Sequence, residues 1–195
     1  MKMNTQGRMI GAAASIAVLS TGAMADHLLT IDLSVVDQIT ITATGGTSLV
    51  TTSGSDTTGI YFENFYGGSG DSLSATLVSG DLTNAENPTD NSPALFRAGG
   101  GTDAGLNMWS FSSDSTVTFT AGSLAFVGSA TWSLDANEYA DMLAGMSGGN
   151  IWFAADDAGD LSSAMVLGSY AVIPSPGVLS LAGLGLGLGM MKRRR

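Results

Sequence analysis

The chain has 195 residues, 44% of them hydrophobic, with a net charge of −10 and no cysteine. The lack of cysteine excludes thiol nucleophiles and thiolate-bound zinc. All 17 acidic residues lie within residues 26–173, where Arg97 is the only basic residue, so this stretch has a net charge of −16. Because such a surface cannot neutralise phosphates, nucleic acid is excluded as a partner.

Residues 1–25 have the layout of a secretory signal peptide. Its basic, apolar and small-residue parts follow in the expected order: Lys2 and Arg8, residues 9–19, and Ala23 and Ala25. We therefore predict an N-terminal signal helix that is removed, so that the mature chain begins at Asp26. Residues 26–173 then form one domain of ordinary size.

The pattern within this domain is typical of β-strands. Hydrophobic residues alternate with Thr, Ser or Asp in four segments: residues 29–35, 39–42, 116–120 and 130–134. A period of two marks strands with one buried and one wet face. Six further candidates are separated by Gly-rich and Asp-rich runs: residues 59–65, 73–78, 106–111, 124–127, 150–154 and 165–172. We predict an all-β fold, an antiparallel β-sandwich or jelly-roll, with long loops at 44–58 and 79–105.

One short helix is predicted after Leu134. Asp135 and Glu138 have the spacing of a capping box, in which the two side chains satisfy backbone N–H groups at the helix start. Apolar residues then recur at helical spacing, and two glycines end the run: Tyr139, Met142, Leu143 and Met146, then Gly148 and Gly149. We expect this helix to cap one end of the β domain.

Aromatic residues are concentrated in residues 61–66. Strand alternation places Tyr61, Glu63 and Phe65 on one face and Phe62, Asn64 and Tyr66 on the other. We expect one face in the core and the other partly exposed. Trp109 and Trp152 are candidates for stacking on sugar rings, although tryptophan at strand positions more often belongs to a core.

Charged residues suited to catalysis are scarce. His27, the only histidine, would be the second residue of the mature chain, where termini are usually frayed. The domain has no lysine, and we predict that the protein is not an enzyme. A paired-carboxylate glycoside hydrolase remains a remote alternative, with three glutamates available: Glu63, Glu86 and Glu138. We expect Arg97 to pair with an aspartate and fix the second long loop.

Asp156, Asp157 and Asp160 surround Gly159 in a predicted turn. Clustered carboxylates are the ligands that hard cations prefer, so a calcium site is one interpretation. A solvated acidic turn is the other. The segment lacks the residue order of an EF-hand loop, and no other cofactor is expected.

Residues 174–195 form a three-part tail. Pro174, Ser175 and Pro176 precede an uncharged apolar stretch at 178–191. A basic cluster follows: Lys192, Arg193, Arg194 and Arg195. This layout resembles the PEP-CTERM sorting signal, with Ser175 where the family usually has glutamate. The resemblance implies a short hydrophobic helix in the inner membrane, recognition by an exosortase-type processing enzyme, and transfer to the cell surface or extracellular matrix.

The sequence thus favours an exported, non-catalytic surface or matrix protein, associated through the resemblance with exopolysaccharide and biofilm. A lectin-like module that binds carbohydrate or another surface, assisted by calcium, is the alternative. That alternative requires an exposed aromatic platform or a metal-binding loop.

Overall fold

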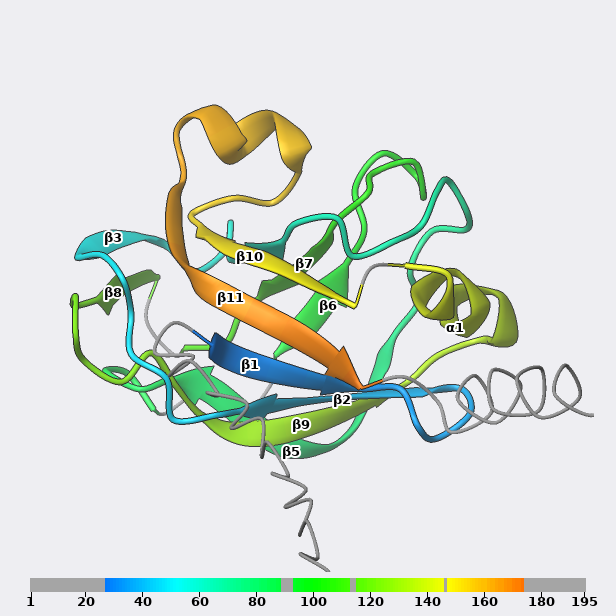
Figure 1. Ribbon diagram of the computed structural model, residues 1–195, viewed down its shortest axis with the longest axis horizontal. Coiled ribbons are helices and arrows are strands. Elements are labelled where there is room, and N and C mark those ends of the chain that lie inside the picture. Colours follow the sequence, from blue (N-terminus) through cyan, green and yellow to red (C-terminus); the bar gives the residue numbers. More distant parts are fainter. Residues whose placement is uncertain (1–26, 89–92, 113–114, 146, 174–195) are drawn as a thin grey trace, which may run out of the picture.

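The computed structural model describes residues 27–88, 93–112, 115–145 and 147–173 (Figure 1). The predicted signal peptide, with Ala23 and Ala25, and the sorting tail from Pro174 to Arg195 lie outside these residues. Among the helices that are described, none has the length and apolar character needed to cross a bilayer.

The described residues are mostly β-structure. The strands are β1 (His27–Asp32), β2 (Gln38–Ala43), β3 (Thr52–Ser55), β4 (Ile60–Phe62), β5 (Thr76–Asn84), β6 (Ala94–Phe96), β7 (Leu106–Trp109), β8 (Thr116–Phe119), β9 (Phe126–Ser133), β10 (Gly148–Phe153) and β11 (Met165–Ile173). An α-helix, α1 (Ala136–Leu143), and a short 3₁₀ helix, η1 (Ala158–Ser162), complete the elements. The prediction of an all-β fold with one short α-helix is confirmed for this part of the chain.

The arrangement of the strands differs from the predicted antiparallel sandwich. Nine strands form one nearly closed sheet in the order β5-β9-β2-β1-β11-β10-β4-β7-β6, and β3 pairs with β8 beside it (Figure 1). The sheet is mixed, because β1 and β11 run parallel at its centre, with Leu29 opposite Tyr170. Parallel strands cannot be joined by a tight turn, and here residues 33–164 form the connection from β1 to β11. Alternation within a strand does not reveal the direction of its neighbour.

Both predicted long loops contain strands. β3 lies within residues 44–58 and β6 within residues 79–105, and β5 continues from the predicted strand at 73–78 into the second loop as far as Asn84. β5 has one glycine and five polar residues among its nine, and its partner β9 stabilises it through a ladder from Thr76–Ser133 to Asn84–Phe126. Pairing with a neighbour therefore outweighs a weak strand pattern. β9 also joins two predicted strands into one, because Gly128 continues the chain at a φ of 87°.

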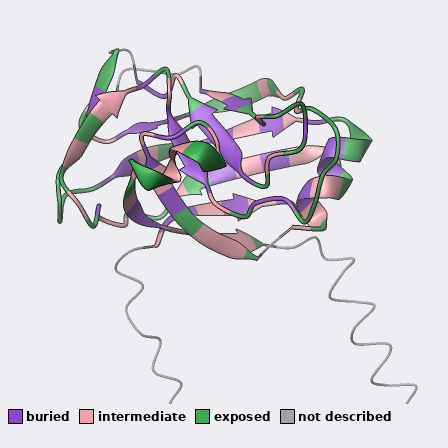
Figure 2. Cartoon of the chain, turned by 90° about the horizontal axis from the view of Figure 1, so that it is seen from above, coloured by how far each residue is buried: buried purple, intermediate pink, exposed green. Residues whose placement is uncertain are grey.

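The inward residues of the strands form a continuous core (Figure 2). Ile39, Ile41 and Trp132 from β2 and β9 are fully buried, as are Phe62 and Phe153 from β4 and β10. Burying one such side chain contributes about 1.5–3 kcal/mol relative to leaving it exposed. This core fixes which residues of the same strands point outward.

Helix α1 has the predicted capping box. The Asp135 carboxylate accepts from the backbone N–H groups of Asn137 and Glu138, and Glu138 accepts from that of Asp135. Glu138 also accepts from the backbone of Ser74. The helix ends at Leu143, before the predicted stop at Gly148 and Gly149, because these glycines begin β10.

Arg97 pairs with an aspartate, as predicted. Its guanidinium lies 3.3 Å from the Asp141 carboxylate on α1 and 3.7 Å from the centre of the Tyr66 ring. It also donates to three backbone carbonyls, those of Gly68 (2.5 Å), Asp103 (2.9 Å) and Asp71 (3.4 Å). We call Arg97 with these partners the Arg97 corner. Because Arg97 is only 2% exposed, it ties two loops and α1 together as a buried structural cation.

Candidate functional site

The outer face of strands β6, β7, β4 and β10 carries a row of aromatic residues. Phe96 lies opposite Asn107, Asn107 opposite Tyr61, and Tyr61 opposite Trp152 across neighbouring strands. Trp109 follows Asn107 by two residues on β7 and so shares its face. The alternate residues of these strands belong to the core, so this row lies on the opposite face of the sheet, where Tyr61 and Asn107 are buried and Phe96 and Trp109 are exposed.

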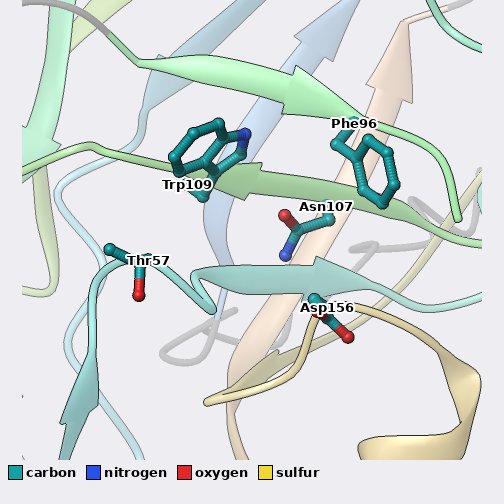
Figure 3. A pocket seen from close by; sticks show the side chains of 5 residues that line it. All are labelled: Thr57, Phe96, Asn107, Trp109 and Asp156. Carbon is teal, nitrogen blue, oxygen red and sulfur yellow. The ribbon is translucent and has the colours of Figure 1, made fainter.

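At one end of the row the surface is hollowed. The hollow has a volume of about 220 Å³, and the described residues that line it are Thr57, Phe96, Asn107, Trp109 and Asp156 (Figure 3). Phe96 and Trp109 are 46% and 37% exposed, so both rings are accessible to a ligand. The volume is below the roughly 300–1,000 Å³ of sites for drug-sized ligands, and it suits one small ring of a longer molecule.

Asn107 forms the polar floor of the hollow. Its amide nitrogen donates to the carbonyls of Thr58 (2.8 Å), Ala155 (2.8 Å) and Ile60 (3.1 Å). Because the nitrogen is fixed by these acceptors, the assignment of the amide is unambiguous and Oδ1 is the remaining acceptor. The residue is only 2% exposed, and no described residue donates to Oδ1. Oδ1 is not among the buried side-chain atoms without a partner, which in the described residues are Nδ1 of His27 and the hydroxyl oxygen of Tyr66. It is an acceptor that lies at the surface of the hollow, where it can accept from a ligand.

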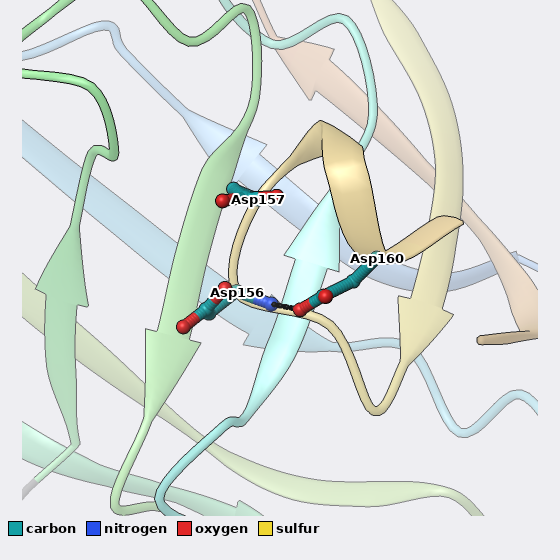
Figure 4. A group of neighbouring side chains, drawn as sticks. All are labelled: Asp156, Asp157 and Asp160. Atoms are coloured by element: carbon teal, nitrogen blue, oxygen red, sulfur yellow. Dashed lines mark hydrogen bonds between the residues drawn. The ribbon is translucent and has the colours of Figure 1, made fainter. Parts of the chain in front are cut away.

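Asp156 brings a carboxylate to the rim, and it belongs to the predicted acidic turn. The carboxylates of Asp156, Asp157 and Asp160 offer ligand atoms within 4.8 Å of one another (Figure 4). Asp160 accepts from the backbone N–H of Asp156 (3.2 Å), and Asp157 accepts from that of Gly159 (2.6 Å) at the start of η1. Partial burial, with the hydrogen bond and charge of Asp160, raises the pKa of the Asp156 carboxyl above its ordinary value.

These three carboxylates have the donor chemistry of a calcium site. Calcium takes about six to eight oxygen ligands, so one oxygen from each would leave half or more of the positions to water or to a ligand. Two of the three side chains also accept backbone hydrogen bonds within the turn. The sequence therefore located the cluster correctly, and calcium binding stays a prediction.

Asp103 connects the acidic turn to the aromatic row. One carboxylate oxygen accepts from the Tyr61 hydroxyl (2.5 Å) and the Gly105 N–H (2.7 Å). The other accepts from the N–H of Ala158 (3.1 Å) in η1. Burial and the Asp103 carboxylate raise the pKa of the Tyr61 hydroxyl, which keeps it a donor at neutral pH. Asp103 thus positions the turn that carries Asp156.

The aromatic run at residues 61–66 departs from the predicted alternation. β4 ends at Phe62 and Asn64 has a φ of 57°, so the chain turns instead of continuing as a strand. All four aromatic residues of the run are buried: Tyr61, Phe62, Phe65 and Tyr66. Glu63 accepts from the indole N–H of Trp152 (2.9 Å) and the amide of Asn150 (3.0 Å). Its carboxylate is therefore occupied in orienting the outer row.

The two tryptophans singled out from the sequence differ in role. Trp109 lines the hollow, whereas Trp152 is half-buried and held by Glu63. Sequence reasoning missed Thr57, Phe96 and Asn107. The alternation of Leu106 and Met108 with Asn107 and Trp109 contains the signal that the latter pair faces outward, but Phe96 and Thr57 come from predicted loops.

Comparison of the chain with protein-family models, with curated proteins and with solved structures gives no match. The hollow combines two accessible aromatic rings with two hydrogen-bond acceptors, Asp156 and the Oδ1 atom of Asn107.

Proposed function

We propose that this chain is an exported, non-catalytic surface or matrix protein whose β domain binds carbohydrate in the hollow beside Trp109. The exported character is supported by the signal-peptide layout of residues 1–25. The similarity of residues 174–195 to a PEP-CTERM signal supports processing by an exosortase-type enzyme after transit through the inner membrane.

The exposure of Trp109 and Phe96 on either side of Asn107 carries the binding proposal. A pyranose ring has an apolar C–H face that packs against aromatic rings and an edge of hydroxyl groups that donate hydrogen bonds. The hollow offers both kinds of partner within a volume of about 220 Å³. A shallow site of this size suits one unit of a polymer, which agrees with exopolysaccharide as the partner.

Isothermal titration calorimetry of oligosaccharides with the full-length chain in detergent tests this proposal. Trp109→Ala should weaken binding of a recognised oligosaccharide at least about tenfold, since it removes the largest stacking surface. Val78→Ala is a matched control, because Val78 is an exposed apolar residue on β5, outside the hollow. Equal affinities for Trp109→Ala and Val78→Ala would place binding elsewhere. No binding to any neutral, acidic or amino oligosaccharide would reject a carbohydrate site.

A further inference from the structure

The polar groups of the hollow are mainly acceptors. Asp156 provides a carboxylate, and Asn107 provides an Oδ1 atom without a protein donor among the described residues. The third polar group is the hydroxyl of Thr57, which forms a hydrogen bond of 2.6 Å with the hydroxyl of Ser55. A ligand that fits this set must therefore supply donors.

The charge around the hollow further restricts the ligand. Asp157 and Asp160 lie next to Asp156 in the acidic turn. The only basic residue of the domain, Arg97, is buried and paired with Asp141. The whole stretch of residues 26–173 has 17 acidic residues against this one cation. Uronic acids and sulfated or phosphorylated sugars would be repelled, whereas a polycation would be attracted over a long range.

We propose that the hollow selects an amino sugar with a free ammonium group, as in a deacetylated hexosamine polymer. The Asp156 carboxylate and the Asn107 Oδ1 atom accept from the ammonium group and a neighbouring hydroxyl. Trp109 and Phe96 pack against the ring, and the faces of these aromatic side chains attract the cation further. The inference rests on the proposed carbohydrate site and names its ligand class.

The independent support for this class is Asn107. A group of surface carboxylates alone is common in acidic proteins without any ligand. Here a side chain 98% buried presents a fixed acceptor in the same hollow, and its amide nitrogen is held by three carbonyls. A carboxylate and a carbonyl oxygen beside aromatic rings match an ammonium group better than an acetamide, which carries no charge.

The test compares short β-1,4-linked oligomers of glucosamine, N-acetylglucosamine and glucose, of equal length, on the full-length chain in detergent. Titrations at about pH 6 keep most of the amine groups protonated. We expect the glucosamine oligomer to bind at least about tenfold more tightly than the other two. Asp156→Asn should reduce this preference to about threefold or less, because it keeps the shape of the side chain but removes the charge that attracts the ammonium group.

Asp81→Asn is the matched control, since Asp81 is exposed on β5 and its substitution changes the net charge equally. An equal loss in Asp81→Asn and Asp156→Asn would show attraction by the overall charge, which overturns the inference. Equal binding of a lysine peptide of the same charge would also overturn it. Binding of glucose or N-acetylglucosamine oligomers without a preference for glucosamine would reject the amino sugar but retain the carbohydrate site. No binding of any oligomer would reject both.

Discussion

The Arg97 corner and the hollow are two acidic regions of one domain, and they differ in whether a basic side chain lies beside the carboxylates. In the corner, Asp141 faces a buried guanidinium that also satisfies three carbonyls. At the hollow, three carboxylates gather within 4.8 Å, and the described residues next to them include no cation. The domain therefore uses Arg97, the only basic residue of its sequence, to hold its loops. We propose that the acidic turn takes a cation from outside the protein.

Asp103 joins the two regions. Its backbone carbonyl accepts from Arg97 (2.9 Å), and its carboxylate holds Tyr61 and the start of η1. The corner therefore supports the hollow through one residue. Perturbing the corner should affect both stability and binding, whereas perturbing the acidic turn should affect binding with little change in stability.

The largest expected effect is that of Arg97→Met. It removes the buried charge and leaves the carbonyls of Gly68, Asp71 and Asp103 without their donor. We expect a loss of about 3 kcal/mol or more in the free energy of unfolding, measured by urea denaturation. Arg97→Lys, which keeps the charge without the planar fork, should lose less. A change below about 0.5 kcal/mol in Arg97→Met would mean that the corner is not a structural support.

Asp103→Asn should have the next largest effect. Both oxygens of its carboxylate accept hydrogen bonds, and an amide would replace one of these oxygens by an NH₂ group that faces a donor. We expect a loss of about 1–3 kcal/mol in unfolding free energy, together with weaker oligosaccharide binding. Tyr61→Phe, which removes a single donor, should cost about 1 kcal/mol. Full retention of binding in folded Asp103→Asn would separate the hollow from the corner.

The sequence predicted the features that depend on neighbouring residues. The two residues of the capping box, Asp135 and Glu138, lie three positions apart in the sequence, and the box was predicted in full. That Arg97 would pair with an aspartate followed from its being the only cation, but its choice of Asp141 depends on the packing of α1. The parallel pairing of β1 with β11 and the meeting of Phe96, Asn107 and Asp156 join distant segments, which no local pattern encodes.

Calcium should stabilise the acidic turn by a smaller amount. If the acidic turn takes an external cation, about 5 mM calcium should stabilise the protein by about 1 kcal/mol, assuming a dissociation constant near 1 mM. Thermal unfolding with and without calcium measures this effect. Asp156→Asn should abolish the shift, and Asp81→Asn should retain it. The same shift in both variants would assign calcium to the general surface.

The smallest effect concerns pH. Because folding raises the pKa of the Asp156 carboxyl, the folded state holds that proton more tightly. This contribution to stability is present at low pH and is lost as pH rises from the ordinary aspartate pKa through the raised value. Asp160→Asn removes the neighbouring charge and should raise stability near pH 7 by less than about 0.5 kcal/mol, since the site is exposed. Thermal unfolding at about pH 4 and 7 checks the sign, and a loss of stability near pH 7 would contradict it.

The most direct test of the hollow uses the three tryptophans as reporters. Trp132 donates its indole N–H to the Pro93 carbonyl in the core, and Trp152 donates to Glu63 on the outer row. Trp109 lines the hollow. The indole N–H signals in a two-dimensional NMR spectrum can be assigned by substituting each tryptophan with phenylalanine. On titration with the glucosamine oligomer, the Trp109 signal should shift in a saturable way while the Trp132 signal stays fixed. A saturable shift of Trp152 with Trp109 unchanged, or no shift at all, would contradict a binding site in this hollow.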